Sequence, residues 1–254
     1  MLHGMTPAPV DKCRVLEIGC ASGGNLLPMA ESLPNSRFLG IDLSVRQIED
    51  GQGIIRELGL ANLELRVADL MTLDSSIGTF DYIICHGVYS WVPEPVQERI
   101  LALCAELLSP HGIAYVSYNI YPGFHKRQPF REMMLYHTAA IGDPVEASRQ
   151  GRALLEFLLQ NVGDTQSAYA RQLRDELEKI RALPPSYLFH EHLEPNNRPC
   201  YFHEFMARAS RHGLQFLTEA EGKSGIELLP GNAQQALAGL RHDIVRREQY
   251  IDFL

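Results

Sequence analysis

Several features that mark large classes of protein are scarce or missing in this chain of 254 residues. It has only five cysteines, an odd number, and no two of them share a C-x-x-C spacing, which argues against a disulfide or zinc framework. No apolar run approaches the roughly 20 residues of a membrane-spanning helix, and no secretory leader pattern opens the chain. The sequence therefore predicts a cytoplasmic protein with reduced thiols and without a membrane partner.

Basic residues are also fewer than acidic residues. The chain has 23 Lys and Arg against 31 Asp and Glu, a formal net charge of −8, and no run of basic residues forms an electropositive stripe. A nucleic-acid partner is therefore not expected. A hydrophobic content of 45% and a charged content of 21% are typical of a globular protein with a full core, either one large domain or one domain with a small appendage.

What the chain does have is a glycine turn between an apolar strand and a helix. Residues 15–24 read V-L-E-I-G-C-A-S-G-G, and Ala21 stands where a dinucleotide-binding loop has its middle glycine. Asp42 follows the first of these glycines by 23 positions and closes a second apolar run, where a carboxylate can accept the hydroxyls of a ribose. Asp42 also suits a helix N-cap beside Ser44, and the two roles are compatible. The pattern predicts a nucleoside-binding α/β fold whose loop wraps an amino-acid tail rather than a diphosphate.

Apolar strands and amphipathic helices alternate along the first half of the chain. This alternation predicts a doubly wound parallel sheet. The expected strands are 14–18, 37–41, 63–68, 82–85 and 113–118, followed after three helical stretches by 187–193 and 214–220. Helices are expected after the glycine turn and at 45–58, 95–108, 129–140, 145–162, 166–183, 202–212 and from 231 onward.

The glycine pattern Glu-x-Gly-x-x-x-Gly with the acidic strand end resembles class I S-adenosylmethionine-dependent methyltransferases. Longer segments are similar to a bacterial subgroup that carries a methyltransferase regulatory domain and includes rickettsial protein-lysine methyltransferases of outer-membrane proteins. These segments are 24–30, 85–93, 116–123 and 187–221. The resemblance implies a Rossmann-like sheet of seven strands, the last antiparallel. It also implies a methyltransferase domain at 1–225 with a helical insertion at 126–182, followed at 226–254 by the start of a helical regulatory region that looks truncated.

The resemblance implies S-adenosyl-L-methionine as cofactor and S-adenosyl-L-homocysteine as product. Asp69, at the end of the third strand, resembles the acid that contacts the adenine amino group, although a turn-forming Asp is common at strand ends. The cofactor-binding residues that the resemblance implies are Glu17, Gly19, Cys20, Ala21, Ser22, Gly23, Asn25, Asp42, Leu43, Gln47, Ala68, Asp69, Leu70, Cys85, His86, Gly87 and Tyr89.

Two further segments follow strands four and five, at the edge where doubly wound sheets place reactive groups. The residues expected to face a methyl acceptor are Tyr89, Trp91, Tyr118, Asn119, Tyr121 and His125. If the acceptor is an amine it must first lose a proton, and His86, Tyr118 and Tyr121 are the candidate bases. The acceptor, protein or small molecule, stays open, as does the oligomeric state. The sequence has no Asn/Asp-Pro-Pro-Tyr motif, which disfavours methylation of adenine N6 or of glutamine.

Other interpretations compete with this one. His190 and His192 invite a metal site with His203 and nearby glutamates, but no third ligand has a fixed spacing, so we expect no metal. A nicotinamide-dependent oxidoreductase would also use Asp42 for a ribose, although Ala21 disfavours it. A non-catalytic module that binds S-adenosylmethionine and contacts a partner protein is the third alternative.

Overall fold

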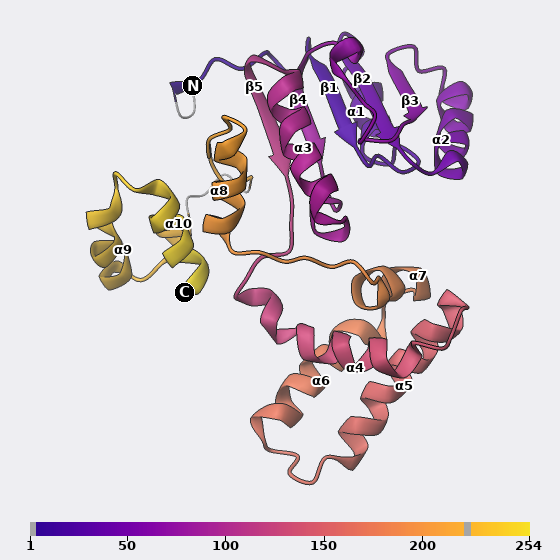
Figure 1. Cartoon of the computed structure of the whole chain (residues 1–254), viewed down its shortest axis with the longest axis vertical. Coiled ribbons are helices and arrows are strands. Elements are labelled where there is room, and N and C mark those ends of the chain that lie inside the picture. The colour runs from indigo at the N-terminus through magenta and orange to yellow at the C-terminus, as the bar shows by residue number, and fades with distance from the viewer. Residues whose placement is uncertain (1–3, 221–224) are drawn as a thin grey trace. The chain divides into compact units, whose positions relative to one another are not determined.

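The structure is a computed structural model that describes residues 4–220 and 225–254. The chain divides into two compact units (Figure 1). Residues Met1–Asn119 and Cys200–Leu254 form the first, called here the sheet unit, and Ile120–Pro199 form the second, called the helical unit. No helix among the described residues combines the length and the apolar character needed to span a membrane.

A parallel sheet of five strands is the centre of the sheet unit, and its strand order is β3-β2-β1-β4-β5. The strands are β1 (Arg14–Ile18), β2 (Arg37–Asp42), β3 (Leu63–Val67), β4 (Phe80–Cys85) and β5 (Leu108–Val116). The direction of winding reverses between β1 and β4. At such a reversal the carboxyl ends of the strands leave a crevice in which α/β proteins bind ligands.

Three helices connect the strands: α1 (Leu26–Ser32), α2 (Val45–Leu58) and α3 (Glu94–Leu107). Helices α1 and α2 pack on one face of the sheet, where Val15, Phe38 and Leu65 of the strands meet Leu26 and Ile48 of the helices in one buried cluster. Between β3 and β4 the chain forms only the short 3-10 helix η2 (Ser75–Ile77).

The C-terminal part of the sheet unit is helical, with α8 (Phe202–Arg211), α9 (Gly231–Leu237) and α10 (Ile244–Phe253). Helix α8 is joined to α3 by an ion pair of 2.8 Å between Arg211 Nη2 and Glu98 Oε1. Helix α10 is joined to α8 through Gln249, whose Oε1 accepts the backbone N–H of His203 at 3.0 Å. These contacts hold the C-terminal helices on the sheet unit.

The helical unit contains α4 (Gln128–Thr138), α5 (Pro144–Asn161), α6 (Ala168–Arg181), α7 (Pro185–Leu188) and the π-helix η5 (Phe189–Leu193). Its buried cluster includes Phe130, Met134, Leu155, Leu173 and Leu177. Apolar spacing along α4, α5 and α6 predicted these three helices, and the structure confirms them.

The first five expected strands are confirmed, but the last two are not found in the described part of the chain. The expected strand at 187–193 is wrong, because α7 and η5 occupy it. Pro185 stands in the first turn of α7, where its fixed φ favours a helix. Leu188 and Leu193 are then buried in the core of the helical unit. Residues 214–220 follow α8 without regular structure, so neither seven strands nor an antiparallel last strand is confirmed.

Candidate functional site

The glycine loop after β1 needs its first glycine for two reasons. Gly19 has φ +72, and a Cβ there would lie 2.4 Å from Cγ2 of Val88, so a side chain is both strained and obstructed. The amides of Gly19 and Cys20 donate to the carbonyl of Ile41 at 2.8 and 3.1 Å. The loop is therefore fixed against the carboxyl end of β2.

Asp42 organises the same loop. Ala21 has a left-handed φ of 50, and its amide donates to Asp42 Oδ2 at 2.9 Å. The other carboxylate oxygen, Oδ1, accepts the amide of Ser44 at 2.8 Å. Each oxygen keeps a further lone pair, so Asp42 can support the loop and still accept hydroxyl groups of a ligand.

Helix α2 approaches the loop through a glycine whose role the sequence did not reveal. A Cβ on Gly51 would lie 2.5 Å from the backbone carbonyl oxygen of Ser22 and 2.5 Å from Cδ1 of Leu65. In the sequence alone, a glycine at this position only weakens the expected helix. Its real function is close packing, which depends on a contact between segments far apart in the chain.

Glu17 is a buried carboxylate with one oxygen left over. Its side chain is only 5% exposed, Oε1 accepts from Asn25 Nδ2 at 3.0 Å, and Oε2 has no partner among the described residues. Burial raises the pKa of this carboxyl above its ordinary value, although the Asn25 hydrogen bond opposes the shift. Unpaired buried acceptors are rare in folded proteins, and a cationic ligand group would satisfy this one.

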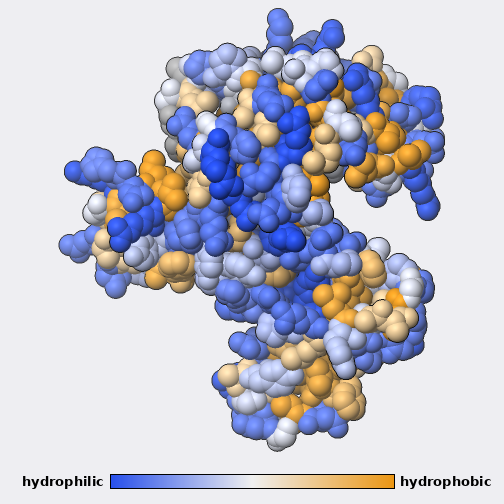
Figure 2. Space-filling view, in the orientation of Figure 1, coloured by the Kyte–Doolittle hydropathy of each residue, from blue (hydrophilic) through white to orange (hydrophobic). Residues whose placement is uncertain are grey.

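A pocket of about 370 Å³ opens at the carboxyl ends of β2 and β3. Predicted cofactor residues that line it are Gly19, Asp42, Leu43, Ala68, Asp69, Leu70 and Gly87. Apolar residues that the sequence did not single out complete it, namely Ile41, Val88, Val92, Pro93 and Val96. Leu43 is 68% exposed beside it, and Figure 2 shows apolar side chains at the surface on the α2 side of the sheet unit. The carboxylates of such a pocket can accept hydrogen bonds from the hydroxyls of a sugar, and its apolar side chains can pack against a planar base.

The other ten predicted cofactor residues do not line this pocket. Cys85 and Tyr89 have no exposed surface and Cys20 is only 4% exposed. Burial raises the pKa of Cys20 and of Tyr89 to about 12 in each case, so both remain protonated at neutral pH. The remaining seven lie around the glycine loop, on α2 or at the end of β4, and are Glu17, Ala21, Ser22, Gly23, Asn25, Gln47 and His86.

The candidate acceptor-facing residues and candidate bases of the sheet unit differ in their surroundings. Trp91 lines the pocket. His86 is exposed, its ring stacks on that of Tyr115, and its Nδ1 lies 3.2 Å from the Tyr115 hydroxyl. Tyr118 stacks on Phe205 with ring centroids 4.3 Å apart, and burial raises its pKa far above the ordinary value. Such a phenol can donate a hydrogen bond but stays protonated at neutral pH. The amide of Asn119 donates to Ser90 Oγ at 2.7 Å.

Tyr121 and His125 belong to the helical unit. Their rings stack with centroids 4.0 Å apart, and the Tyr121 hydroxyl donates to Gln128 Oε1 at 3.1 Å.

The candidate metal-site histidines His192 and His203 contact protein side chains. His192 Nε2 lies 2.7 Å from Glu176 Oε1, and His203 Nδ1 lies 2.7 Å from Gln249 Oε1. The described residues contain no group of three His, Cys, Asp or Glu side chains arranged to hold a metal ion.

Comparison with known proteins identifies two families along the chain. Residues 15–112 match the family described as "Methyltransferase domain", and residues 184–254 match "Predicted methyltransferase regulatory domain". RP028 of Rickettsia prowazekii (strain Madrid E), described as uncharacterized, is 40% identical over 216 residues, which cover 85% of this chain and 86% of that protein. RP789 of the same organism, also uncharacterized, is 41% identical over 254 residues, which cover all of this chain and 46% of that protein.

Solved structures of PKMT2 from Rickettsia typhi are also similar to this chain. One aligns with a TM-score of 0.86 and 41% identity over 99% of this chain and 48% of that chain. A second, in complex with AdoHcy, aligns with a TM-score of 0.85 and the same identity and coverage. This chain thus spans about half the length of RP789 and of PKMT2. With its matches to both families and to RP028, the chain belongs to the S-adenosylmethionine-dependent methyltransferases that carry a methyltransferase regulatory domain.

Proposed function

We propose that this chain binds S-adenosyl-L-methionine at the glycine loop and the adjoining pocket and transfers its methyl group to an acceptor, releasing S-adenosyl-L-homocysteine. The observation that carries the proposal is the unpaired, buried Oε2 of Glu17 at the base of a loop whose other side is organised by Asp42. The AdoHcy complex of PKMT2 supports the choice of cofactor.

The residues present fit each part of this cofactor. Glu17 offers a carboxylate to the ammonium of the amino-acid tail, and Asp42 offers lone pairs to the ribose hydroxyls. Asp69, whose Oδ1 already accepts the amide of Met71 at 2.9 Å, has a second oxygen for the adenine amino group. Leu43 and Val88 supply apolar surface for the base.

S-adenosylmethionine supplies an activated methyl group on a sulfonium, so the chain's own task is to orient the acceptor and exclude water. We propose lysine side chains of a protein as the acceptor, on the strength of the resemblance to protein-lysine methyltransferases. A lysine has an ordinary pKa of about 10.4 and must lose a proton first. His86 is our candidate to take it, directly or through water, and Tyr118 would orient the acceptor as a hydrogen-bond donor. Tyr121 and His125 of the helical unit remain candidates for acceptor contacts.

We also propose that residues 226–254 belong to the helical regulatory region. The regulatory-domain match over 184–254 and the helices α9 and α10 support this assignment.

Calorimetric titration with S-adenosylhomocysteine tests the cofactor proposal. We expect Asp42→Ala to weaken binding at least about tenfold, since it removes charge-assisted hydrogen bonds to the ligand and loosens the loop. Asp50→Ala, an exposed acid of α2, is the matched control and should bind like wild type. Absence of binding by wild type, or equal affinity of wild type and Asp42→Ala, would contradict the proposal.

The acceptor and the competing functions need separate assays. Radiolabelled S-adenosylmethionine added to fractionated lysate should label protein fractions rather than small molecules if lysine is the acceptor. Binding of S-adenosylhomocysteine without transfer to any acceptor would favour a non-catalytic module. Saturable binding of NADH in a fluorescence titration would favour the oxidoreductase alternative.

A further inference from the structure

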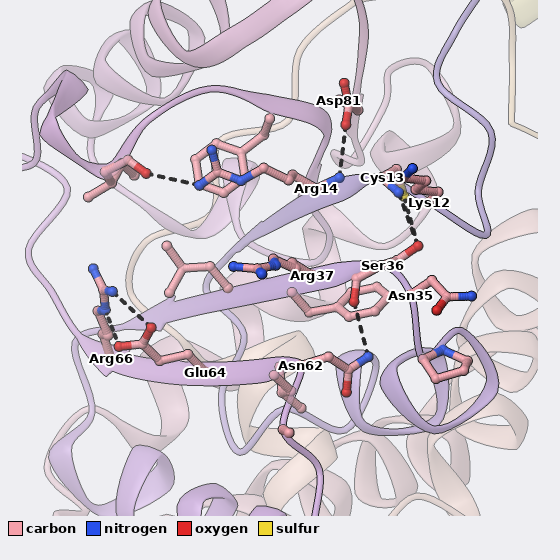
Figure 3. A pocket seen from close by; sticks show the side chains of 17 residues that line it. Lys12, Cys13, Arg14, Asn35, Ser36, Arg37, Asn62, Glu64, Arg66 and Asp81 are labelled. Atoms are coloured by element: carbon pink, nitrogen blue, oxygen red, sulfur yellow. Dashed lines mark hydrogen bonds and ion pairs between the residues drawn. The ribbon is translucent and has the colours of Figure 1, made fainter.

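A second hollow, of about 990 Å³, lies on the sheet unit away from the cofactor pocket (Figure 3). It covers the amino-terminal halves of β1, β2 and β3, and none of its lining residues also lines the cofactor pocket. Charged side chains dominate it, and they are Lys12, Arg14, Arg37, Glu64, Arg66 and Asp81.

The hollow lies at the amino-terminal end of this face of the sheet, whereas Leu16, Ile18 and Ile83 of the same face are fully buried. Parallel sheets are normally covered on both faces by the helices that connect their strands. Here the connection from β3 to β4 has only the three-residue η2 (Ser75–Ile77). Side chains alternate along a strand, so Arg14, Arg37 and Glu64 point away from the face that α1 and α2 bury.

Like charges meet on this face. Arg14 of β1 and Arg37 of β2 are register partners on adjacent strands, and like charges so placed repel each other. The Arg14 guanidinium is anchored, with Nη2 donating to the Ile77 carbonyl at 3.3 Å and Cζ 4.9 Å from the Phe80 ring centroid. Arg37 and Lys12 are exposed, and their side chains make no hydrogen bond or ion pair with any other described residue.

The acidic side chains of the hollow are already engaged. Glu64 is paired with Arg66, whose Nε lies 2.5 Å from its Oε1. Asp81 accepts the backbone amide of Arg14 at 2.8 Å and the Ser109 hydroxyl at 2.9 Å. With Glu64 and Arg66 cancelling, Lys12, Arg14 and Arg37 exceed Asp81 by two positive charges, on a chain whose net charge is −8.

The floor of the hollow is held in place by hydrogen bonds. Asn62 Nδ2 donates to the carbonyls of Ala30, Leu33 and Ser36 at 3.0 to 3.1 Å. Ser36 Oγ accepts the amide of Cys13 at 3.1 Å. Because these groups are already held in place, they lose little conformational entropy when a ligand binds.

We propose that this face is a binding site for a phosphate-type dianion, either inorganic phosphate or the phosphate group of a small molecule. Guanidinium groups present planar pairs of donors that match phosphate oxygens, and a lysine adds a point charge. Two excess positive charges complement a dianion, and its binding relieves the repulsion between Arg14 and Arg37.

Calorimetric titration of the full chain at low salt in a phosphate-free buffer tests the site. The probes are inorganic phosphate, pyrophosphate and a phosphate monoester, and saturable binding of at least one is expected. Arg37→Gln and Lys12→Gln should each weaken it about tenfold, the effect of one charge-assisted hydrogen bond. Arg56→Gln, an exposed arginine of α2 outside the hollow, should bind like wild type.

All three variants should bind S-adenosylhomocysteine like wild type, so failure of this site is distinguishable from failure of the proposed function. Thermal unfolding shows whether each variant is folded. If Arg37→Gln does not fold, the phosphate affinity of Lys12→Gln tests the site. A preference for the monoester over inorganic phosphate indicates a metabolite. The proposal is overturned if no probe saturates, if Arg56→Gln weakens binding as much as Arg37→Gln, or if a poly-glutamate peptide binds more tightly than every phosphate.

Discussion

At the residue scale, Glu17 is a buried carboxylate that lowers the stability of the fold but can bind a cationic group of a ligand. Its side chain is 5% exposed, with one oxygen paired to Asn25 and the other unpaired among the described residues. Burial raises its pKa above 4.5, which means that folding disfavours the ionised form. The free energy of unfolding therefore increases as pH falls through the raised pKa of Glu17 toward 4.5, because the buried carboxyl becomes protonated. It decreases again as pH rises and the carboxyl ionises.

We expect Glu17→Gln to stabilise the protein at pH 7 by about 1 kcal/mol, because it removes a buried charge. The same substitution should weaken S-adenosylhomocysteine binding at least about tenfold, because it removes the partner of the ligand's ammonium. Urea unfolding and calorimetry measure the two effects. Glu31→Gln, an exposed acid of α1, is the control and should change neither. A destabilised Glu17→Gln with wild-type affinity would contradict the assigned role.

At the element scale, helix α2 carries two internal glycines with different functions. The helix begins at Ser44, whose Oγ accepts the Gln47 amide at 3.4 Å, and ends at Gly59 in the left-handed conformation. Gly51 is buried against the backbone of Ser22, whereas a Cβ on Gly53 would meet only the end of the flexible Arg56 side chain, 4.0 Å away.

Gly51→Ala should destabilise the protein by about 2 to 3 kcal/mol, because the added methyl group collides with backbone that cannot move without displacing the glycine loop. Gly53→Ala should stabilise it by about 0.5 to 1 kcal/mol, since alanine favours a helix. Urea unfolding separates the two, and S-adenosylhomocysteine affinity should fall only in Gly51→Ala. Equal effects of the two substitutions would show that α2 does not support the loop.

At the scale of the whole molecule, the helical unit has its own buried ionic network. Glu176 is 2% exposed, and its Oε1 lies 2.7 Å from His192 Nε2 and 3.3 Å from Arg127 Nε. Arg127 also pairs with Glu191 at 2.6 Å. Burial alone would raise the pKa of Glu176, but the hydrogen bond from His192 and the charge of Arg127 outweigh it, and the pKa is lowered.

Glu176→Gln should destabilise the protein by about 1 to 3 kcal/mol, because it removes the carboxylate that the buried His192 ring and Arg127 contact. A carboxyl with a lowered pKa stabilises the fold above its unfolded value, so wild type should lose this contribution as pH falls below about 4.5, and the variant should lose less. Thermal unfolding from pH 3 to 7 measures both effects. Glu178→Gln, an exposed acid on α6, is the control. Equal stability of Glu176→Gln and wild type over this pH range would contradict this account.

The sequence by itself determined the features that depend on neighbouring residues. Apolar runs bounded by turn residues marked the first five strands, and the glycine turn with Asp42 marked the site, because a strand, a tight turn and a cap each depend on a few consecutive side chains. Residues 187–193 were misjudged for the same reason. The alternation of strands and helices along the chain suggested a strand there, whereas Leu188 and Leu193 belong to the buried core of the helical unit.

Only the tertiary structure decided what depends on contacts between distant segments. The clash that requires glycine at Gly19 comes from Val88, and the one at Gly51 comes from Ser22. The basic face is invisible in the sequence because Arg14 and Arg37 lie 23 positions apart, and only strand register makes them neighbours. Packing at long range selects among conformations that local preference leaves nearly equal in free energy, and here it assembled both the proposed cofactor pocket and the proposed anion site.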